Sequence, residues 1–286
     1  MRTITLPGNE TRPALGLGTW KMGESRARRA AEVDAVRLAL AIGYRVLDTA
    51  EMYGDGGAEE VVGEAVGGAL RDGIAREDLF IVSKVYPHNA DRTGIVAACE
   101  RSLRRLKLDQ IDLYLLHWRG NHPLAETLAG FAEVQRRGWI RRWGVSNFDA
   151  DDLQELRRHD GGDACAANQV YYSLGHRGVE FDLLPWQQRH GVPLMAYSPI
   201  DQGALVGRRA DPALQAVASR HDATPAQVAL AALIAKPNVM AIPKAVREPH
   251  LRENWQAATL ALDADDLAAL DRAFPPPRHK TRLAMI

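Results

Sequence analysis

The chain has 286 residues, and its 36 Lys and Arg residues balance its 36 Asp and Glu residues, so the formal net charge is zero. A neutral chain has no overall field that draws it to nucleic acid or to an acidic membrane, so we expect small-molecule partners. Residues 1–13 lack the apolar core of a signal peptide, and no stretch stays apolar for the ~18 residues that a membrane helix needs. The two cysteines, Cys99 and Cys165, argue against a disulfide framework and fit a reducing compartment. These features predict a cytoplasmic protein that binds neither nucleic acid nor membranes.

The first predicted element is a β-hairpin, with residues 3–6 as its first strand and Pro7-Gly8-Asn9 as its turn. After it, short apolar runs alternate with amphipathic stretches at spacings of roughly 25–35 residues, as βα units give. The runs are residues 15–19, 45–49, 79–84, 111–117, 140–146, 164–169, 192–198 and 239–242. Eight such runs suit the strands of a parallel sheet covered by helices, and they predict an α/β fold of the (β/α)8 TIM-barrel type. We expect the hairpin to close the barrel floor.

Two predicted helices carry clear end signals. The helix whose apolar face includes Val33 and Leu40 should end at Gly43, and another should begin at Pro225 after the capping residue Thr224. No low-complexity segment or long linker interrupts the sequence. We therefore expect residues 1–286 to form a single domain, since a TIM barrel occupies roughly 250 residues.

Four polar residues follow or end the apolar runs at the side of a barrel where active sites lie. Asp48, Lys84 and His117 end three successive runs, and Tyr53 follows Asp48 closely enough to curl over the same rim. Taken singly, each has a structural explanation. Asp48 could cap the helix that begins after Gly57, Lys84 could mark the wet end of a strand, His117 could be a surface or core residue, and Tyr53 could be a rim aromatic. Their convergence on one face favours a shared chemical role.

Proton donation to a carbonyl group fits these four residues. A free Tyr has a pKa near 10, and a nearby ammonium such as Lys84 would lower it by favouring the phenolate. Asp48 is the counter-charge that would keep a buried Lys84 protonated. A neutral His117 could donate from one ring nitrogen to the carbonyl oxygen.

Asp48, Tyr53, Lys84 and His117, in this order, resemble the catalytic tetrad of the aldo/keto reductase superfamily. Further segments are similar to the signatures of that family and occur in its order, so that the resemblance spans nearly the whole chain. They are residues 17–21 (LGTWK), 48–54 (DTAEMYG), 112–117 (DLYLLH), 144–147 (GVSN), 168–170 (NQV), 197–199 (YSP) and 242–244 (IPK). Residues 50–57 and 180–186 look closest to bacterial members linked to methylglyoxal reduction.

The resemblance implies that NADPH binds across the barrel mouth without a Rossmann domain. This agrees with the sequence, because Gly16-Leu-Gly18 is too short for the G-x-G-x-x-G motif. By the resemblance, Ser146, Asn147 and Gln169 hold the carboxamide of the nicotinamide, and Tyr197 stacks on its ring. The full set of expected cofactor residues is Gly18, Thr19, Trp20, Asp48, Ser146, Asn147, Gln169, Tyr197, Ser198, Pro199, Leu205, Lys244, Ala245, His250, Glu253 and Asn254.

The adenine end departs from the family pattern. Many NADPH-binding relatives have Lys-Ser and an Arg six residues after the Lys, whereas this chain has Lys244, Ala245 and His250. His lacks the bidentate fork of Arg, so we expect a preference for NADPH that is softened, with NADH as a weaker alternative. Arg247 and Arg252 are the other cations in this segment.

The expected substrate is a small carbonyl compound. The resemblance points to a pocket formed by Trp20, Tyr53, Tyr86, His117 and Trp118. His88 and Asn121 are expected near its edge, and no metal is expected. The short C-terminal tail, residues 271–286, should leave the mouth open and admit small or varied aldehydes such as methylglyoxal.

Two alternatives remain open from the sequence. One is a non-catalytic, NADPH-binding regulatory protein on the same fold, which would not need Lys84 beside Tyr53. The other is a Schiff-base aldolase with Lys84 as the nucleophile. That hypothesis leaves four residues unexplained: Ser146, Asn147, Gln169 and Tyr197. The sequence does not define the oligomeric state, and a monomer is compatible with it.

Overall fold

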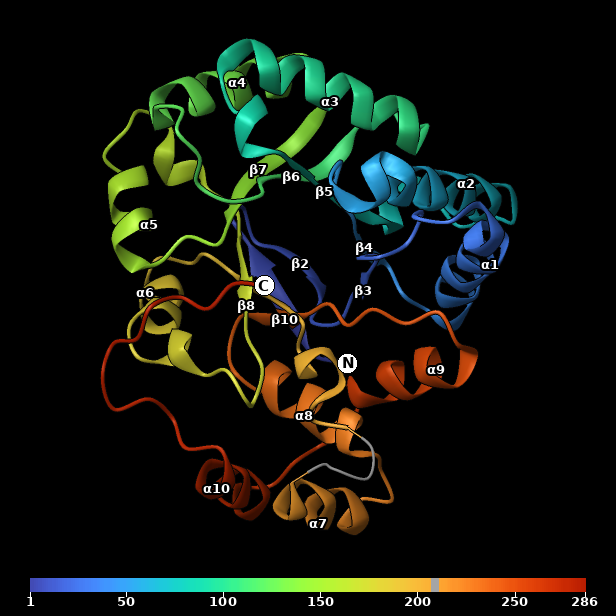
Figure 1. Ribbon diagram of the computed structural model, residues 1–286, viewed down its shortest axis with the longest axis vertical. Coiled ribbons are helices and arrows are strands. Elements are labelled where there is room, and N and C mark those ends of the chain that lie inside the picture. The colour runs from blue at the N-terminus through green and yellow to red at the C-terminus, as the bar shows by residue number, and fades with distance from the viewer. Residues whose placement is uncertain (207–210) are drawn as a thin grey trace.

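Eight parallel strands lie side by side in one sheet of the computed structural model, which describes residues 1–206 and 211–286 (Figure 1). Their spatial order follows the chain: β3 (Leu17–Gly18), β4 (Val46–Asp48), β5 (Phe80–Val85), β6 (Ile111–Leu116), β7 (Ile140–Ser146), β8 (Asn168–Tyr171), β9 (Leu194–Tyr197) and β10 (Val239–Ala241). Parallel bridges from Leu15 to Ala241 and from Gly18 to Lys244 join the first strand to the last. The sheet therefore closes, which confirms the predicted barrel.

The strands are apolar because both faces of the sheet are covered. Every residue of β5 and of β6 is buried, as expected for a parallel sheet between a packed interior and outer helices. One predicted strand began too early. The run 164–169 begins at the last residue of a short turn, Gly162–Ala164, and the regular strand starts only at Asn168.

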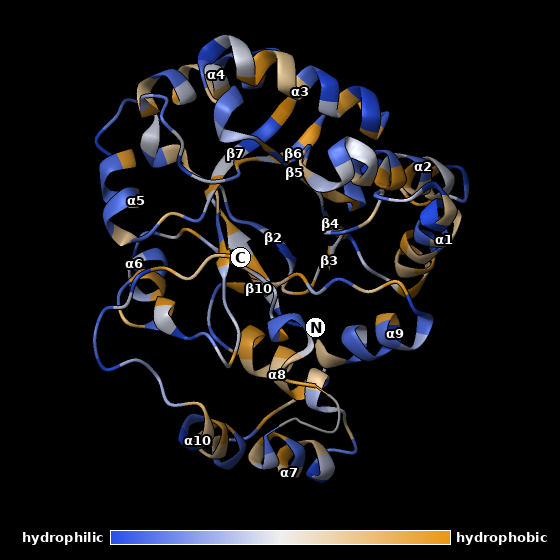
Figure 2. Cartoon of the chain, in the orientation of Figure 1, coloured by the Kyte–Doolittle hydropathy of each residue, from blue (hydrophilic) through white to orange (hydrophobic). Residues whose placement is uncertain are grey.

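The outer layer consists of helices that alternate with the strands along the chain. They are α1 (Arg26–Ile42), α2 (Gly57–Arg71), α3 (Arg92–Leu106), α4 (Leu124–Arg136), α5 (Ala150–Leu156), α6 (Leu183–Arg189), α7 (Pro212–Arg220), α8 (Pro225–Ile234), α9 (Glu248–Ala257) and α10 (Ala264–Ala273). In Figure 2 most of them carry hydrophilic and hydrophobic residues on different faces, whereas α8 is mostly hydrophobic and is buried along its length from Gln227 to Ile234.

Both predicted helix ends are confirmed. Gly43 follows α1 with φ 132°, and a side chain there would meet the ring of Trp255 at 2.6 Å, so glycine is required. Thr224 and Gln227 form a reciprocal capping box at the start of α8.

The predicted hairpin is present and lies at the floor of the barrel. Its strands are β1 (Thr3–Leu6) and β2 (Glu10–Pro13), which pair antiparallel. Ile4 and Leu6 are buried in the main core. The Thr5 amide donates to Oδ1 of Asn238, the residue before β10, at 2.8 Å. The hairpin therefore covers the amino ends of the strands, which leaves the carboxyl ends for a site.

Both cysteines are free and buried, as predicted. Burial raises the pKa of the Cys99 thiol and of the Cys165 thiol to about 12, so neither is a reactive thiolate at neutral pH. Among the described residues, none of the helices is long and apolar enough to cross a membrane.

Candidate active site

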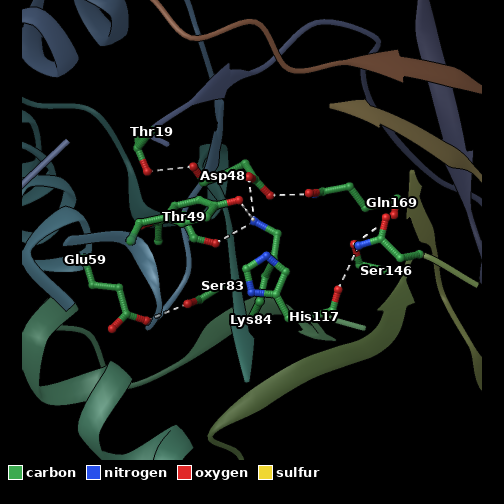
Figure 3. A network of polar contacts seen from close by, with 11 residues as sticks. Thr19, Asp48, Thr49, Glu59, Ser83, Lys84, His117, Ser146 and Gln169 are labelled. Atoms are coloured by element: carbon green, nitrogen blue, oxygen red, sulfur yellow. Dashed lines mark hydrogen bonds and ion pairs between the residues drawn. The ribbon is translucent and has the colours of Figure 1, made fainter. Parts of the chain in front are cut away.

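A fully buried lysine lies at the centre of the candidate site. Lys84 Nζ lies 2.7 Å from Asp48 Oδ1, 2.8 Å from the Thr49 carbonyl oxygen and 3.2 Å from the Tyr53 hydroxyl (Figure 3). Three hydrogen-bond partners match the three donors of an ammonium group. With none of its side chain exposed, Lys84 does not mark the wet end of a strand.

The strand register explains why these residues meet. Asp48 ends β4 opposite Val82 on β5, and Lys84 lies two residues further along β5, on the same side of the sheet. Lys84 in turn pairs with Leu115 on β6, and His117 lies two residues beyond that position. The three side chains therefore point the same way at the carboxyl ends of neighbouring strands.

Asp48 is held as the partner of the buried ammonium. Its Oδ1 binds Lys84, and its Oδ2 accepts a hydrogen bond of 2.7 Å from Gln169 Nε2. Burial alone would lower the pKa of Lys84, but Asp48 and Tyr53 together outweigh this effect and leave that pKa above its ordinary value. Asp48 does not cap α2, because the residue at that position is Gly56 and no side chain caps the helix.

Tyr53 begins the short 3-10 turn Tyr53–Gly56, after the loop that follows β4. Burial raises the pKa of Tyr53, the Lys84 ammonium opposes that rise, and the net pKa lies above its ordinary value. This corrects the expectation of a lowered pKa, because desolvation of the phenolate outweighs the attraction of Lys84. The hydroxyl therefore keeps its proton at neutral pH and can act as a donor.

His117 follows β6, lines the cavity described below and is neutral. Burial, with the Lys84 charge nearby, lowers the pKa of His117 well below its ordinary value. Its ring meets the Tyr53 ring edge-on, with 5.6 Å between centroids. Its Nδ1 atom is buried and has no hydrogen-bond partner among the described residues. A neutral imidazole carries one N–H donor and one acceptor, so His117 can bind a polar atom that enters the site.

The neutrality of His117 can be tested by nuclear magnetic resonance. The imidazole signal of His117, identified by its loss in His117→Gln, should not shift between pH 5.5 and 8, because its pKa lies well below its ordinary value. An unperturbed imidazole, with a pKa near 6.5, would titrate across that range. A midpoint near 6.5 would show that His117 takes up a proton and is not the neutral donor inferred here.

The four residues border a cavity of about 480 Å³ at the carboxyl ends of the strands. Lys84 lies behind the wall, and the other three form part of it. Those residues predicted for catalysis or binding that line the cavity are Gly18, Trp20, Asp48, Tyr53, His117, Trp118, Ser146, Asn147, Gln169, Tyr197, Ser198, Pro199, Lys244 and His250. The structure thus brings most of the predicted site together in one space.

Other predicted residues lie outside this wall. Thr19 is buried behind it and donates to the Asp48 carbonyl oxygen at 2.9 Å. Tyr86 meets the Trp118 ring edge-on, with 5.8 Å between centroids. The remaining ones are Leu205, Ala245 and Asn254, which are buried, Glu253, which is partly exposed, and His88 and Asn121, which are exposed.

The polar groups next to the tetrad form a connected network. The Tyr197 hydroxyl donates to Asn147 Oδ1 at 2.9 Å, and Asn147 Nδ2 donates to the His117 carbonyl oxygen at 3.1 Å. Ser146 Oγ donates to the Gln169 carbonyl oxygen at 2.8 Å (Figure 3). Asn147 has φ 59°, a left-handed conformation that Asn tolerates better than most residues. Neither Ser146-Asn147 nor Tyr197 is therefore isolated from the tetrad.

At the far end of the cavity lies a group of basic residues. Lys244 is exposed and has no hydrogen bond or ion pair within the described part of the chain. Partial burial lowers the pKa of Lys244. The charges of Glu32 and Glu24 oppose this shift, and those of Arg28 and Lys21 add to it. Arg247 Nη2 lies 2.9 Å from His250 Nε2. Such a group can accept an anion.

The C-terminal tail corrects the expectation of an open mouth. Helix α10 continues to Ala273, and the tail after it returns across the barrel, where Met285 and Ile286 line the cavity (Figure 1). Lys280 fixes the tail by contacts with Asp151 at 2.9 Å and Asp182 at 3.2 Å. These contacts join distant parts of the chain, and the length of the tail carries no signal of them.

Sequence reasoning missed several other residues of the cavity wall. Lys21, with φ 65°, has its ammonium 4.5 Å from the Trp20 ring centroid. Its position directly after the predicted residues 18–20 was the signal available. The other missed residues are Met52, Ile200, Gln202, Gly203, Val206, Ile242 and Pro243.

Comparison with known proteins places these features in context. The model of the aldo/keto reductase family matches residues 14–274. Methylglyoxal reductase YeaE of Escherichia coli (strain K12) is 47% identical, over 100% of this chain and 99% of its own length. Glyoxal reductase of Bacillus subtilis (strain 168) is 34% identical, over 94% of this chain and 91% of its own. An aldo-keto reductase from Klebsiella pneumoniae, crystallised in complex with NADPH, has a TM-score of 0.92 at 47% identity and full coverage of both chains.

Proposed function

The chain belongs to the aldo/keto reductase family, and from that premise we propose that it reduces small aldehydes with NADPH, with Tyr53 as the proton donor. The observation that carries the proposal is the Tyr53 hydroxyl, which lies 3.2 Å from the fully buried Lys84 ammonium at the wall of the cavity. A buried ammonium beside a phenol stabilises the phenolate that forms when the phenol releases its proton.

Two observations fit a bound dinucleotide. Tyr197 lines the cavity beside Asn147 and offers a ring on which a nicotinamide can stack, and the Lys244 side chain offers an unpaired cation at the cavity wall. We assign the nicotinamide to Ser146, Asn147, Gln169 and Tyr197, and the 2′-phosphate to Lys244. When bound, NADPH supplies the hydride that reduces the carbonyl carbon.

The residues of this chain then bind and protonate the carbonyl oxygen of the substrate. His117, held neutral by burial, donates one ring N–H to that oxygen and polarises the C=O bond. Tyr53 transfers its hydroxyl proton to the same oxygen as negative charge develops there. Lys84 stabilises the resulting phenolate from 3.2 Å, and Asp48 keeps Lys84 charged while it does so.

The substrate class follows from the wall near Tyr53. This part of the cavity is largely apolar, because its wall includes Trp20, Met52, Trp118 and Ile286. Its polar groups are Tyr53 and His117. A small aldehyde can place its oxygen between the two polar groups and its remainder against the apolar wall. The names of the relatives from E. coli and B. subtilis support methylglyoxal and glyoxal as first substrates to try.

The function is tested by following NADPH absorbance with methylglyoxal, glyoxal and a panel of aliphatic and aromatic aldehydes. We expect oxidation of NADPH with at least one small aldehyde. If NADPH binds but no aldehyde is reduced, the reductase proposal fails and the non-catalytic, NADPH-binding alternative replaces it.

Lys84 argues against the aldolase alternative. A Schiff base requires a neutral amine, whereas the pKa of Lys84 lies above its ordinary value because Asp48 and Tyr53 together outweigh the effect of burial. The ammonium is also held by three oxygen atoms. Borohydride should therefore trap no aldehyde on Lys84.

Lys244→Ala should weaken NADPH binding by roughly 10- to 100-fold and leave NADH binding nearly unchanged, the effect expected for one charged hydrogen bond. The reason is that the 2′-phosphate, which NADH lacks, is the anion assigned to this unpaired cation. Titration of the wild type and the variant with each cofactor measures the ratio of the NADPH affinity to the NADH affinity. The control is Lys236→Ala, which removes a partly exposed cation outside the cavity wall, 3.4 Å from Glu180. An unchanged NADPH to NADH ratio in Lys244→Ala would remove Lys244 from the phosphate site.

A further inference from the structure

The loop that follows β9 forms one side of the candidate cavity. Six of its residues line the cavity: Ser198, Pro199, Ile200, Gln202, Gly203 and Val206. Two residues of this loop are buried: Pro199, at the cavity wall, and Leu205, in a separate apolar cluster. The position of the loop therefore determines the shape of that side of the site.

The backbone of this loop is strained. Ser198, Asp201 and Gln202 have φ values of 47°, 54° and 51°, all in the left-handed region, and Gly203 has φ 98°. Left-handed conformations are unfavourable for residues other than glycine and persist where surrounding contacts enforce them. The local bonds from the Asp201 amide to the Ser198 carbonyl oxygen and from Gly203 to Ile200 form only short turns. A contact outside the loop is needed to hold it.

Asp201 provides that contact. The Tyr171 hydroxyl donates to its carboxylate, and His176 Nε2 lies 3.3 Å from Asp201 Oδ1. Gly175 leaves room for the carboxylate, since a Cβ atom there would lie 2.8 Å from Asp201 Oδ2. The His176 amide in turn donates to the Ser173 carbonyl oxygen at 3.1 Å, which keeps the receiving turn tight.

Tyr171 also connects this contact to the tetrad side of the cavity. It pairs with Tyr197 across β8 and β9, and the two rings stack with 5.6 Å between centroids and 14° between planes. Tyr197 then donates to Asn147, next to His117. The loop is thus fastened to the same side chains that face the proposed nicotinamide.

We propose that Asp201 is a positioning residue whose contacts with Tyr171 and His176 hold the loop of residues 198–206 against bound cofactor and so slow the release of NADPH. The inference rests on the proposed function, because it needs NADPH in this cavity. Asp201 touches neither cofactor nor substrate in this role; it acts through the loop. Its loss should therefore change cofactor binding and leave the chemical step unchanged.

The test measures NADPH affinity and dissociation rate in Asp201→Ala, Asp201→Asn and Tyr171→Phe. Asp201→Ala should weaken NADPH binding by about tenfold or more, mainly through faster dissociation, as for loss of one charged hydrogen bond. The single-turnover rate of aldehyde reduction and the KM for the aldehyde, both at saturating NADPH, should stay within about twofold. Asp201→Asn keeps an oxygen that accepts from Tyr171, so it should recover most of the affinity.

Tyr171→Phe keeps the stacked ring and removes only the hydroxyl, so it should reproduce part of the effect. The double variant Asp201→Ala/Tyr171→Phe should then be no weaker than Asp201→Ala alone, because both changes remove the same bond. Tyr172→Phe is the matched control, since it removes a tyrosine bond to a carboxylate, that of Glu180, at the next position and outside the cavity wall.

The outcomes separate the two proposals. If the wild-type protein does not bind NADPH, the proposed function fails. If it binds NADPH and Asp201→Ala binds it equally well, the role of Asp201 is wrong. The role of Asp201 is also wrong if Tyr172→Phe weakens NADPH binding as much as Asp201→Ala does. If Asp201→Ala does not fold, by circular dichroism, the milder Tyr171→Phe and Asp201→Asn decide the question by the same measurements.

Discussion

Tyr53→Phe should lower the rate of aldehyde reduction by about 10²–10⁴-fold, the usual contribution of a general acid, and leave NADPH affinity unchanged. The substitution removes the hydroxyl that lies 3.2 Å from Lys84 and keeps the ring beside His117. Single-turnover oxidation of NADPH with methylglyoxal measures the rate, and a separate titration measures binding.

The matched control is Tyr114→Phe. Tyr114 is fully buried in β6 and lies outside the cavity wall, so removal of its hydroxyl should leave the rate unchanged. If Tyr53→Phe retains the wild-type rate, Tyr53 is not the proton donor. If both variants lose activity equally, loss of packing and not loss of a proton would explain the result.

The cluster of catalytic residues could be predicted from the sequence because the ends of regular β-strands hold it. Asp48, Lys84 and His117 each end an apolar run, and the carboxyl ends of parallel strands meet at one rim of a barrel. The strand registers Asp48 to Val82 and Lys84 to Leu115 then fix their relative heights. Strand ends of this kind are visible in a sequence as polar residues that follow apolar ones.

The pKa of Tyr53 shows where sequence reasoning stops. The pairing of Tyr53 with a lysine could be predicted, but the net direction of its pKa depends on how much water the folded site excludes. Burial dominates in the structure and raises that pKa. The extent of burial is set by neighbours from several distant segments, and a sequence does not display it.

The irregular parts of the site could not be predicted for a related reason. The loop after β9 and the C-terminal tail have no periodic pattern, and their positions depend on single long-range contacts. Asp201 binds Tyr171, and Lys280 binds Asp151 and Asp182. Such contacts join residues far apart in the chain, and no local pattern of side chains indicates which partner will be chosen.

Lys84→Met should abolish aldehyde reduction and also lower the free energy of unfolding by about 3–5 kcal/mol at neutral pH. The figure is that for removal of one partner from a buried ion pair, which leaves the other charge uncompensated. The charge left behind is Asp48, whose carboxylate is 2% exposed. Urea unfolding of the wild type and the variant measures the difference. A loss below about 1 kcal/mol would mean that Asp48 is not a buried charge that depends on Lys84.

The double variant Asp48→Asn/Lys84→Met is the control for that explanation. Asn at position 48 has no charge, and its amide can still bond to Gln169, the second partner of Asp48. We expect the double variant to unfold at a higher urea concentration than Lys84→Met alone, although it will also be inactive. If it is less stable than the single variant, lost packing and not the unpaired charge causes the destabilisation.

The pH dependence separates these causes further. In the wild type, Asp48 and Tyr53 together outweigh burial and raise the pKa of Lys84. The buried ammonium therefore contributes stability below the unfolded lysine pKa of about 10.4, and this stability is lost as pH rises through the folded value. In the wild type, burial already raises the pKa of Asp48 above its ordinary value, and Lys84 opposes that rise. In Lys84→Met the opposing charge is gone, so the pKa of Asp48 should lie further above its unfolded value of about 3.9. The folded variant then binds a proton that the unfolded chain has released, and its stability falls as pH rises from about 4. The stability difference between wild type and variant should therefore be smaller at pH 5 than at pH 8. A difference that is constant between those pH values would contradict the buried charge at Asp48, on which the protonation of Lys84 and the proton transfer from Tyr53 both depend.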